Sequence, residues 1–236
     1  RYTISGTIPK RKDRYRLYLS IARPDSLFIT DLQEKFQTAG IEVKNSNLGQ
    51  LPETTWFHYP SDYLGDIVHS LNVRSDNLYA ESVLRLLSLS VHEKGSAEKG
   101  IDIIRKYWQN YEADSLELFM YDGSGLARNN KVSAKYLNCV LKETARDSLI
   151  GEYFVQTLPL AGKEGSVATF MKHGELPGEL RLKSGSMSDV HAYAGYYTTP
   201  QNRYAIVVMI NNYTCTRAQL KQKISALLTQ VLSKKE

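Results

Sequence analysis

The sequence contains no long hydrophobic run. Its longest unbroken apolar stretch lies around residues 204–210, whereas about 20 consecutive apolar residues are needed to span a bilayer. The first seven residues also lack the apolar segment of a signal peptide and read as the inside of a strand. We therefore expect no membrane span, and we expect the chain to be a piece of a longer protein. Its 42% hydrophobic content suffices for one sizeable core, or one core with a remnant of another.

Residues that commonly bind metals are few and poorly spaced. The two cysteines lack the paired spacing of a zinc site, and the five histidines include no His-x-x-x-His pair and have no neighbouring cysteines. The sequence therefore predicts no catalytic metal and no cofactor, and it leaves open whether the cysteines pair. The residues concerned are Cys139 and Cys215, and His58, His69, His92, His173 and His191.

The positive charge is modest and weakly organised. The formal net charge is +5, and the clearest basic cluster covers residues 10–14. An excess of positive charge can favour an anionic partner. No motif that combines aromatic and basic residues accompanies the cluster, so we interpret it as a solvated turn and expect no nucleic-acid binding.

Hydrophobic periodicity predicts alternating helices and strands in the first part of the chain. We expect Asp25 to cap the first helix and Gly40 to end it, with Leu32 and Phe36 on its apolar face. The expected elements are two strands within residues 1–21, a helix over 26–39, a strand over 55–59, a helix that Ser61 caps and that ends near 71, and a helix over 77–90.

The remainder is expected to end in an antiparallel sheet that a helix covers. That last helix should place Leu220, Ile224, Leu227 and Val231 against the sheet. The whole pattern predicts an α/β (α+β) fold, with an antiparallel sheet and flanking helices. The expected elements are helices over 97–111, 133–144, 148–157 and 216–233, a short strand over 116–120, and strands over 180–186, 190–199 and 204–211.

Ser75-Asp76-Asn77 matches the pattern Ser-x-Asn. In that pattern a hydroxyl can pass a proton to a leaving group while the amide holds a substrate carbonyl. The match is weak by itself, because residues 70–72 satisfy it too and are interpreted as a helix end. Ser75 could equally be an ordinary helix N-cap.

Lys183-Ser184-Gly185-Ser186 matches the pattern Lys-Ser/Thr-Gly-Ser/Thr, on a predicted strand. Lys183 would supply positive charge, Ser184 and Ser186 would supply hydroxyls for a substrate carboxylate, and Gly185 would leave room for a peptide along the strand. The alternative interpretation is a lysine on a solvated strand edge.

The two motifs follow one another in an order that resembles the S13 peptidases, the penicillin-binding D-Ala-D-Ala carboxypeptidases and endopeptidases. Residues 75–84 resemble that family's second motif, and residues 122–130 resemble its Asp-Gly-Ser-Gly-Leu-Ser-Arg-x-Asn signature, with Ala127 where serine is usual. Residues 158–165 and 183–196 resemble its third-motif region, with Ser184 in place of the usual threonine.

The resemblance implies a lobe like that of β-lactamases and transpeptidases, incomplete because its N-terminal half is absent. Residues 1–20 would be a strand segment bordering a missing inserted domain, and residues 21–236 the C-terminal part of the transpeptidase-like domain. In this family a Ser-x-x-Lys motif precedes the second motif and supplies the nucleophile. No serine within residues 1–74 has lysine three positions later, so we expect no nucleophile in this chain. The match at Ser96 and Lys99 comes too late and is explained as a helix cap.

The resemblance also implies roles for the motif residues in acyl transfer to an absent serine. Ser75 would relay a proton, Asn77 would hold the acyl side chain, and Lys183 would supply the field, with a pKa that its neighbours can lower. Leu126 and Met187 could line the pocket, with core packing as the alternative. The substrate would be a peptidoglycan stem peptide ending in D-Ala-D-Ala, and β-lactams would inhibit.

Several interpretations stay open on the residues alone. The chain could be a noncatalytic peptidoglycan-binding module, a serine β-lactamase, or an α/β domain with coincidental motifs. No residue separates carboxypeptidase from endopeptidase action. The missing N-terminal part, or a homodimer, would cover the apolar surface that an incomplete lobe exposes. The resemblance alone implies a periplasmic or otherwise extracytoplasmic location.

Overall fold

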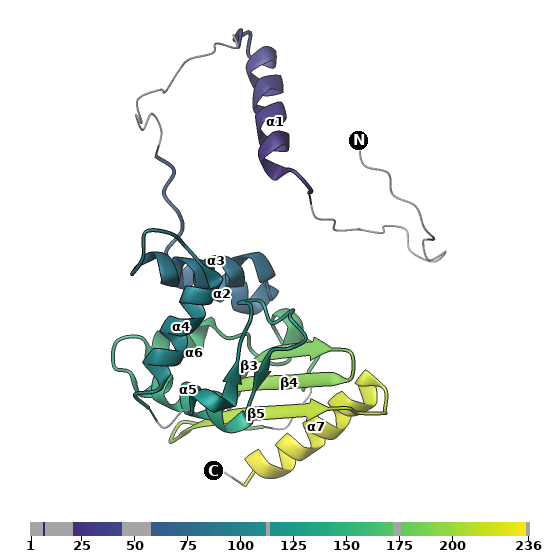
Figure 1. Cartoon of the computed structure of the whole chain (residues 1–236). Helices are drawn as coiled ribbons and strands as arrows, with labels where there is room; N and C mark the ends of the chain where they lie inside the picture. Colours follow the sequence, from purple (N-terminus) through teal and green to yellow (C-terminus); the bar gives the residue numbers. More distant parts are fainter. Residues whose placement is uncertain (1–6, 8–20, 44–57, 112–113, 172–175, 235–236) are drawn as a thin grey trace. The chain divides into compact units, whose positions relative to one another are not determined.

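The computed structural model describes residues 7, 21–43, 58–111, 114–171 and 176–234 (Figure 1). The chain divides into two compact units, Arg1–Tyr59 and Pro60–Glu236. The strands expected within residues 1–21 and most of the strand expected over 55–59 lie outside the described residues, and His58 and Tyr59 adopt no strand. The boundary expected between residues 20 and 21 stays a prediction. In the described part, no helix is long and apolar enough to cross a membrane.

Helix α1, Pro24–Thr38, is the described element of the first unit. Asp25 was expected to cap it, but Arg23 occupies the N-cap and Asp25 lies in the first turn, where its carboxylate pairs with the Arg23 guanidinium at 3.0 Å. Pro24 explains this start, because proline at the first helical position has no N–H to leave unsatisfied. Leu32 and Phe36 are the half-buried residues of α1, as expected from their spacing, and Gly40 follows the helix end at a φ of +74°.

Three antiparallel strands in the order β3-β4-β5 form the sheet of the second unit. They span Glu179–Met187, Val190–Thr198 and Arg203–Asn211, close to the predicted ranges. Helix α7, Arg217–Leu232, lies along one face of this sheet, shown in yellow in Figure 1. Its N-cap Thr216 and Gln219 form a reciprocal capping box.

The buried face of α7 differs from the prediction in its second half. Leu220 and Ile224 are buried as expected, but Leu227 and Val231 are 52% and 47% exposed. The next residue in each case, Leu228 and Leu232, is buried instead. The buried residues are spaced four apart and form one row along the sheet. Composition could not distinguish this row from the expected one, because residues 227 and 228 are both leucine and residues 231 and 232 are both apolar.

Helices α5, Ala134–Arg146, and α6, Gly151–Thr157, cover the opposite face of the sheet. Tyr196 of β4 is buried there, and its hydroxyl donates to the Leu141 carbonyl at 2.7 Å. The helix expected from residue 148 begins three residues later. In the turn that precedes it, the N–H groups of Leu149 and Ile150 donate to the Asp147 carboxylate. The mixed α/β fold with flanking helices is confirmed.

Helices α2, α3 and α4 form the remaining layer and span Leu64–Arg74, Asn77–Leu89 and Ala97–Trp108. Ser61 was expected to cap α2, but Tyr63 occupies that N-cap and makes no side-chain bond there. Helix α2 packs closely on α6 at two points. Gly65 leaves no room for a side chain, because an added Cβ would lie 2.1 Å from the Tyr153 ring. Asn72 donates to the Thr157 hydroxyl at 3.0 Å. Both partners of that hydrogen bond are buried.

A loop over residues 121–130 is anchored on α3 by a carboxylate. It joins β1, Leu118–Phe119, which follows the short helix Ser115–Glu117, to β2, Lys131–Val132, a strand that was not predicted. Glu81 accepts from the Gly123 N–H, the Ser124 N–H and the Ser124 hydroxyl at 2.9–3.0 Å. Asp122 folds the loop internally, accepting from the Gly125 and Ala127 N–H groups and from Asn130.

We expect Leu228→Ala to lower the free energy of unfolding by about 2–5 kcal/mol, because it empties a buried site between α7 and the sheet. The matched control is Leu227→Ala, which removes the same atoms from an exposed side chain and should cost well under half as much. Urea unfolding of both variants measures the difference. A larger loss for Leu227→Ala would mean that α7 presents the face expected from sequence.

We expect Glu81 to make the stability of this chain depend on acidic pH. Burial raises the pKa of its carboxyl, but hydrogen bonds from Ser124, Arg85 and Gly123 outweigh it, so the pKa lies below its ordinary value of 4.5. A lowered folded-state pKa contributes stability above the unfolded-state value and loses it as the pH falls through the folded-state value.

Glu81→Gln should therefore flatten the loss of unfolding free energy below pH 4.5, since glutamine keeps the shape without the titration. Glu81→Ala should cost about 1–3 kcal/mol at neutral pH through the unsatisfied loop N–H groups. Glu98→Gln, at an exposed position of α4, is the control and should leave the acidic slope as in the wild type. Urea unfolding from pH 3 to pH 7 measures how the free energy of unfolding depends on pH. Equal acidic slopes for the wild type, Glu81→Gln and Glu98→Gln would contradict the prediction.

Candidate active site

Ser75 lies between two helices in an unusual backbone conformation. It ends α2 at φ +56° and ψ +51°, in the left-handed region that non-glycine residues seldom adopt. Asp76, and not Ser75, caps α3 by accepting from the Tyr79 N–H at 3.1 Å. The alternative interpretation of Ser75 as an N-cap is therefore wrong, and the Ser75 hydroxyl has another partner. Such strained residues are typical of functional sites.

That partner is the ammonium group of Lys183, which donates to the Ser75 hydroxyl at 2.9 Å. The two residues are 108 positions apart in the chain, so the fold joins the two motifs directly. Lys183 also donates to the Ser184 carbonyl at 2.8 Å. Burial lowers the pKa of Lys183 below its ordinary value. It is therefore a positioned, partly desolvated lysine and not one on a solvated strand edge.

Strand β3 is covered along one half of its outer edge and open along the other. The segment 159–161 pairs with the first half, through Leu182 N–H to the Pro159 carbonyl at 3.0 Å and Ala161 N–H to the Leu180 carbonyl at 2.8 Å. Among the described residues no strand pairs with the outer edge of the second half, Lys183–Met187. Because backbone groups alternate sides along a strand, the N–H and C=O of Ser186 face this open edge.

The other motif residues surround this edge. Ser184 is half-buried and donates through its hydroxyl to the Ser166 hydroxyl at 2.7 Å, while Gly185 and Ser186 are exposed. A Cβ on Gly185 would meet no atom within 4 Å. The absent side chain thus leaves open space beside the strand.

Three further predicted residues lie on nearby elements. Asn77 is exposed in the first turn of α3, two residues after Ser75. Leu126 is 61% exposed in the loop that Glu81 anchors, and Met187 ends β3 half-buried. The exposure of Leu126 argues against core packing there. The part that these residues play in a pocket stays a prediction.

The weaker motif matches have structural explanations. Asn72 is buried inside α2 on Thr157, so residues 70–72 serve helix packing. The Ser96 hydroxyl accepts from the Lys99 N–H at 3.4 Å as the N-cap of α4, as expected of a cap. Cys139 and Cys215 form no disulfide.

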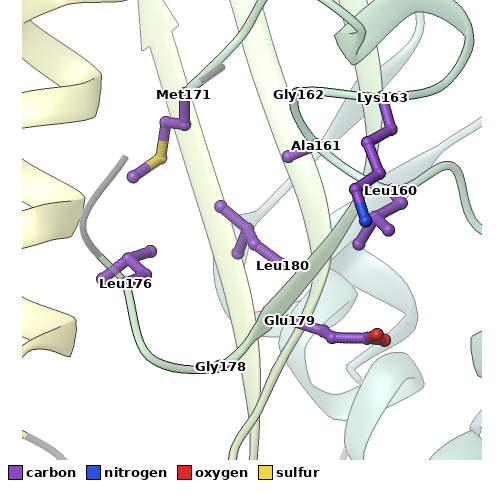
Figure 2. Close-up of a pocket in the computed structure, with 9 residues that line it drawn as sticks. All are labelled: Leu160, Ala161, Gly162, Lys163, Met171, Leu176, Gly178, Glu179 and Leu180. Carbon is purple, nitrogen blue, oxygen red and sulfur yellow. The ribbon is translucent and has the colours of Figure 1, made fainter. Parts of the chain in front are cut away.

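A pocket lies beside the first residues of β3 (Figure 2). It has a volume of about 330 Å³, with the apolar Met171, Leu176 and Leu180 on one side and Lys163 and Glu179 on the other. Neither residues 75–77 nor residues 183–186 line this cavity, whereas Leu160, Ala161 and Gly162 of the segment 158–165 do. It is therefore separate from the cluster around Ser75 and Lys183.

Sequence reasoning missed Ser166, which contacts the third motif directly. Ser166 lies in the short helix η2, Gly165–Val167. The only local signal was Gly165, which the resemblance included, because a glycine there permits a positive φ of +52°. A serine beside a glycine is too common to have been selected from sequence.

The comparisons with known proteins identify relatives of this chain. The chain is 25% identical over 237 residues to D-alanyl-D-alanine carboxypeptidase DacB of Haemophilus influenzae, covering 97% of this chain and 49% of the relative. It is 24% identical to the D-alanyl-D-alanine carboxypeptidase of Actinomadura sp. strain R39, covering 89% and 41%. It thus spans about half the length of these relatives or less.

A solved structure shares the fold. Penicillin binding protein 4 (dacB) from Haemophilus influenzae, complexed with a β-lactam, aligns with a TM-score of 0.72 at 24% identity, covering 91% of this chain and 52% of that one. The model of the D-Ala-D-Ala carboxypeptidase 3 (S13) family matches residues 1–234. The chain therefore belongs to the S13 family.

Proposed function

We propose that this chain forms the part of a serine-type D-Ala-D-Ala carboxypeptidase that binds the substrate and moves the proton. The observation that carries the proposal is the 2.9 Å hydrogen bond between Lys183 and Ser75. It brings a cation and a hydroxyl from two separate motifs to one point beside an open strand edge. Membership of the S13 family supports the same reaction.

The roles of the residues follow from this geometry. Acylation of a serine releases D-alanine, whose nitrogen must gain a proton as the peptide bond breaks, while the attacking serine loses one. Ser75 can relay that proton by accepting it and donating its own to the nitrogen, and Lys183 stabilises the hydroxyl oxygen during the transfer. Asn77, exposed at the start of α3, would hold the acyl chain through its amide.

The substrate would lie along the open half of β3 as an added strand. The Ser186 N–H can then donate to the oxygen on which charge develops, and its carbonyl can accept from the peptide. The hydroxyls of Ser184 and Ser186 would bind the terminal carboxylate, and Gly185 leaves the space that the backbone needs. Leu126 and Met187 would contact the stem peptide.

The nucleophile would come from a segment outside residues 1–236, since no Ser-x-x-Lys precedes Ser75. Apolar side chains near the site support a covering segment: Leu78, in the first turn of α3, is 72% exposed, and Leu126 is 61% exposed. We infer that the nucleophile-bearing segment covers this surface. The alternative is that a second copy of this chain covers the surface. The molecular mass of the isolated chain in solution would reveal such a homodimer.

The partners and location follow from the same proposal. The substrate would be a peptidoglycan stem peptide ending in D-Ala-D-Ala, and β-lactams would acylate the same serine. The complex of the Haemophilus influenzae structure with a β-lactam supports binding of such compounds. Peptidoglycan lies outside the cytoplasm, so the enzyme would act there, in the periplasm where one exists. Endopeptidase action on cross-links would use the same residues.

We expect penicillin to acylate a form of the protein extended to the full length of its relatives, and to leave the 236-residue chain unmodified. Intact-mass spectrometry measures the adduct. Ser75→Ala in the longer form should slow acylation about 100-fold, the size of a lost proton relay. Ser96→Ala, which removes only a helix cap, should not slow it.

Each other outcome selects a different function. No adduct on either form would identify a noncatalytic peptidoglycan-binding module. Rapid release of hydrolysed penicillin would identify a β-lactamase. An adduct on the short chain that Ser96→Ala abolishes would place the nucleophile at the residue that the structure assigns to a cap.

We expect the acylation rate of the longer form to fall at alkaline pH as Lys183 loses its proton. Because burial lowers the pKa of Lys183, the fall should be centred below its ordinary value of 10.5. In Lys183→Arg the guanidinium stays charged, so this fall should disappear although the rate is lower throughout. Stopped-flow acylation between pH 7 and pH 11 measures both, and an unchanged alkaline fall in the variant would assign it to another group.

A further inference from the structure

A hydroxyl outside the motifs touches the hydroxyl that we assign to the substrate carboxylate. The Ser184 hydroxyl donates to the Ser166 hydroxyl at 2.7 Å, a short and therefore well-formed hydrogen bond. Both groups are accessible from solvent, so a bound carboxylate can reach the pair. The Ser166 hydroxyl can thus act as a second hydroxyl that contacts the Ser184 hydroxyl.

The backbone around Ser166 is fixed on both sides. Val167 is fully buried in the core between the sheet and α7, and its carbonyl accepts from the Gly162 N–H at 3.0 Å. Gly165 has a φ of +52°, and a Cβ there would lie 2.1 Å from the Val73 carbonyl oxygen. Ser166 is therefore held between the core and the last turn of α2. That turn immediately precedes Ser75 in the sequence.

Ser184 needs such a partner more than a threonine would. A threonine side chain is stiff at χ1 because two heavy atoms branch from its Cβ, whereas serine can turn its hydroxyl among three rotamers. Ser184 stands where the motif usually has threonine. An unguided serine hydroxyl would point away from the open edge part of the time and would lose affinity by that fraction.

We propose that Ser166 is a positioning residue that orients the Ser184 hydroxyl for the substrate carboxylate, an inference that rests on the proposed function. A hydroxyl has one donor and two acceptor sites. When a carboxylate binds, the Ser184 O–H turns to donate to it, and the Ser166 O–H turns to donate to the Ser184 oxygen. No proton leaves either group, and each hydrogen bond in the chain polarises the next.

The test is the preference of the protein for a carboxylate. Calorimetry on the longer form gives the ratio of affinities for a non-cleavable analogue of a peptide ending in D-Ala-D-Ala and for the same analogue ending in an amide. Ser166→Ala should reduce this ratio about tenfold, the size of one hydrogen bond in a charged network. Ser166→Thr, which keeps the hydroxyl, should preserve it.

The second arm introduces Ser184→Thr. In that background Ser166→Ala should reduce the ratio by less than about threefold, since the branched side chain already restricts χ1. Ser90→Ala is the control for losing an exposed hydroxyl, which there donates to the Leu87 carbonyl in another part of the chain. It should leave the ratio unchanged in both backgrounds.

The outcomes separate this inference from the proposed function. The role of Ser166 would be overturned if Ser166→Ala left the ratio unchanged or weakened both ligands equally. It would also be overturned if Ser166→Ala reduced the ratio equally in the two backgrounds, or if the wild type showed no preference for the carboxylate. Penicillin acylation measured on the same proteins tests the function separately. A wild type that forms no adduct but shows the expected ratios would remove the function and retain the positioning role.

Discussion

Strand β3 must be a core strand at one end and an open edge at the other, and the arrangement of the site depends on that division. Leu180 and Leu182 are buried against α7, and the segment 159–161 satisfies the outer backbone groups beside them. Beyond Leu182 the covering segment stops and the Lys183–Met187 half begins. An uncovered edge normally invites unwanted pairing, and here polar side chains and a glycine line it.

The second constraint is that Ser75 must reach this edge from another layer of the molecule. Its left-handed backbone turns the chain sharply between α2 and α3, which costs conformational energy that the surroundings must offset. Packing on both sides does so. Asn72 is bonded to Thr157 within the buried layer, and the Val73 carbonyl lies against Gly165. The strained serine is thus held by neighbours that themselves contact β3 or α6.

The structure brings Ser75 and Lys183 of the two motifs into contact, and periodicity predicted most of the fold. Sequence reasoning failed where contacts in space decide. The sheet strands were placed within about a residue of their observed bounds. The face of α7 was wrong because Leu227 and Leu228 are chemically identical and only the sheet selects between them. Likewise, Asp76 rather than Ser75 caps α3. Ser166 could not be found because its partner lies 18 positions away.

Two departures from the family pattern have different consequences, and the contacts explain why. Ala127 replaces a usual serine, but the loop uses its backbone: the Ala127 N–H donates to Asp122 at 2.6 Å, and any residue except proline can do this. That change therefore leaves the loop anchored on Glu81. Ser184 replaces a usual threonine at a position where the side chain acts, so the change alters what must orient the hydroxyl. At that position the chain has a second hydroxyl nearby, because Ser184 donates to Ser166 at 2.7 Å. Under the proposed role, this contact replaces the side-chain stiffness that a threonine would supply.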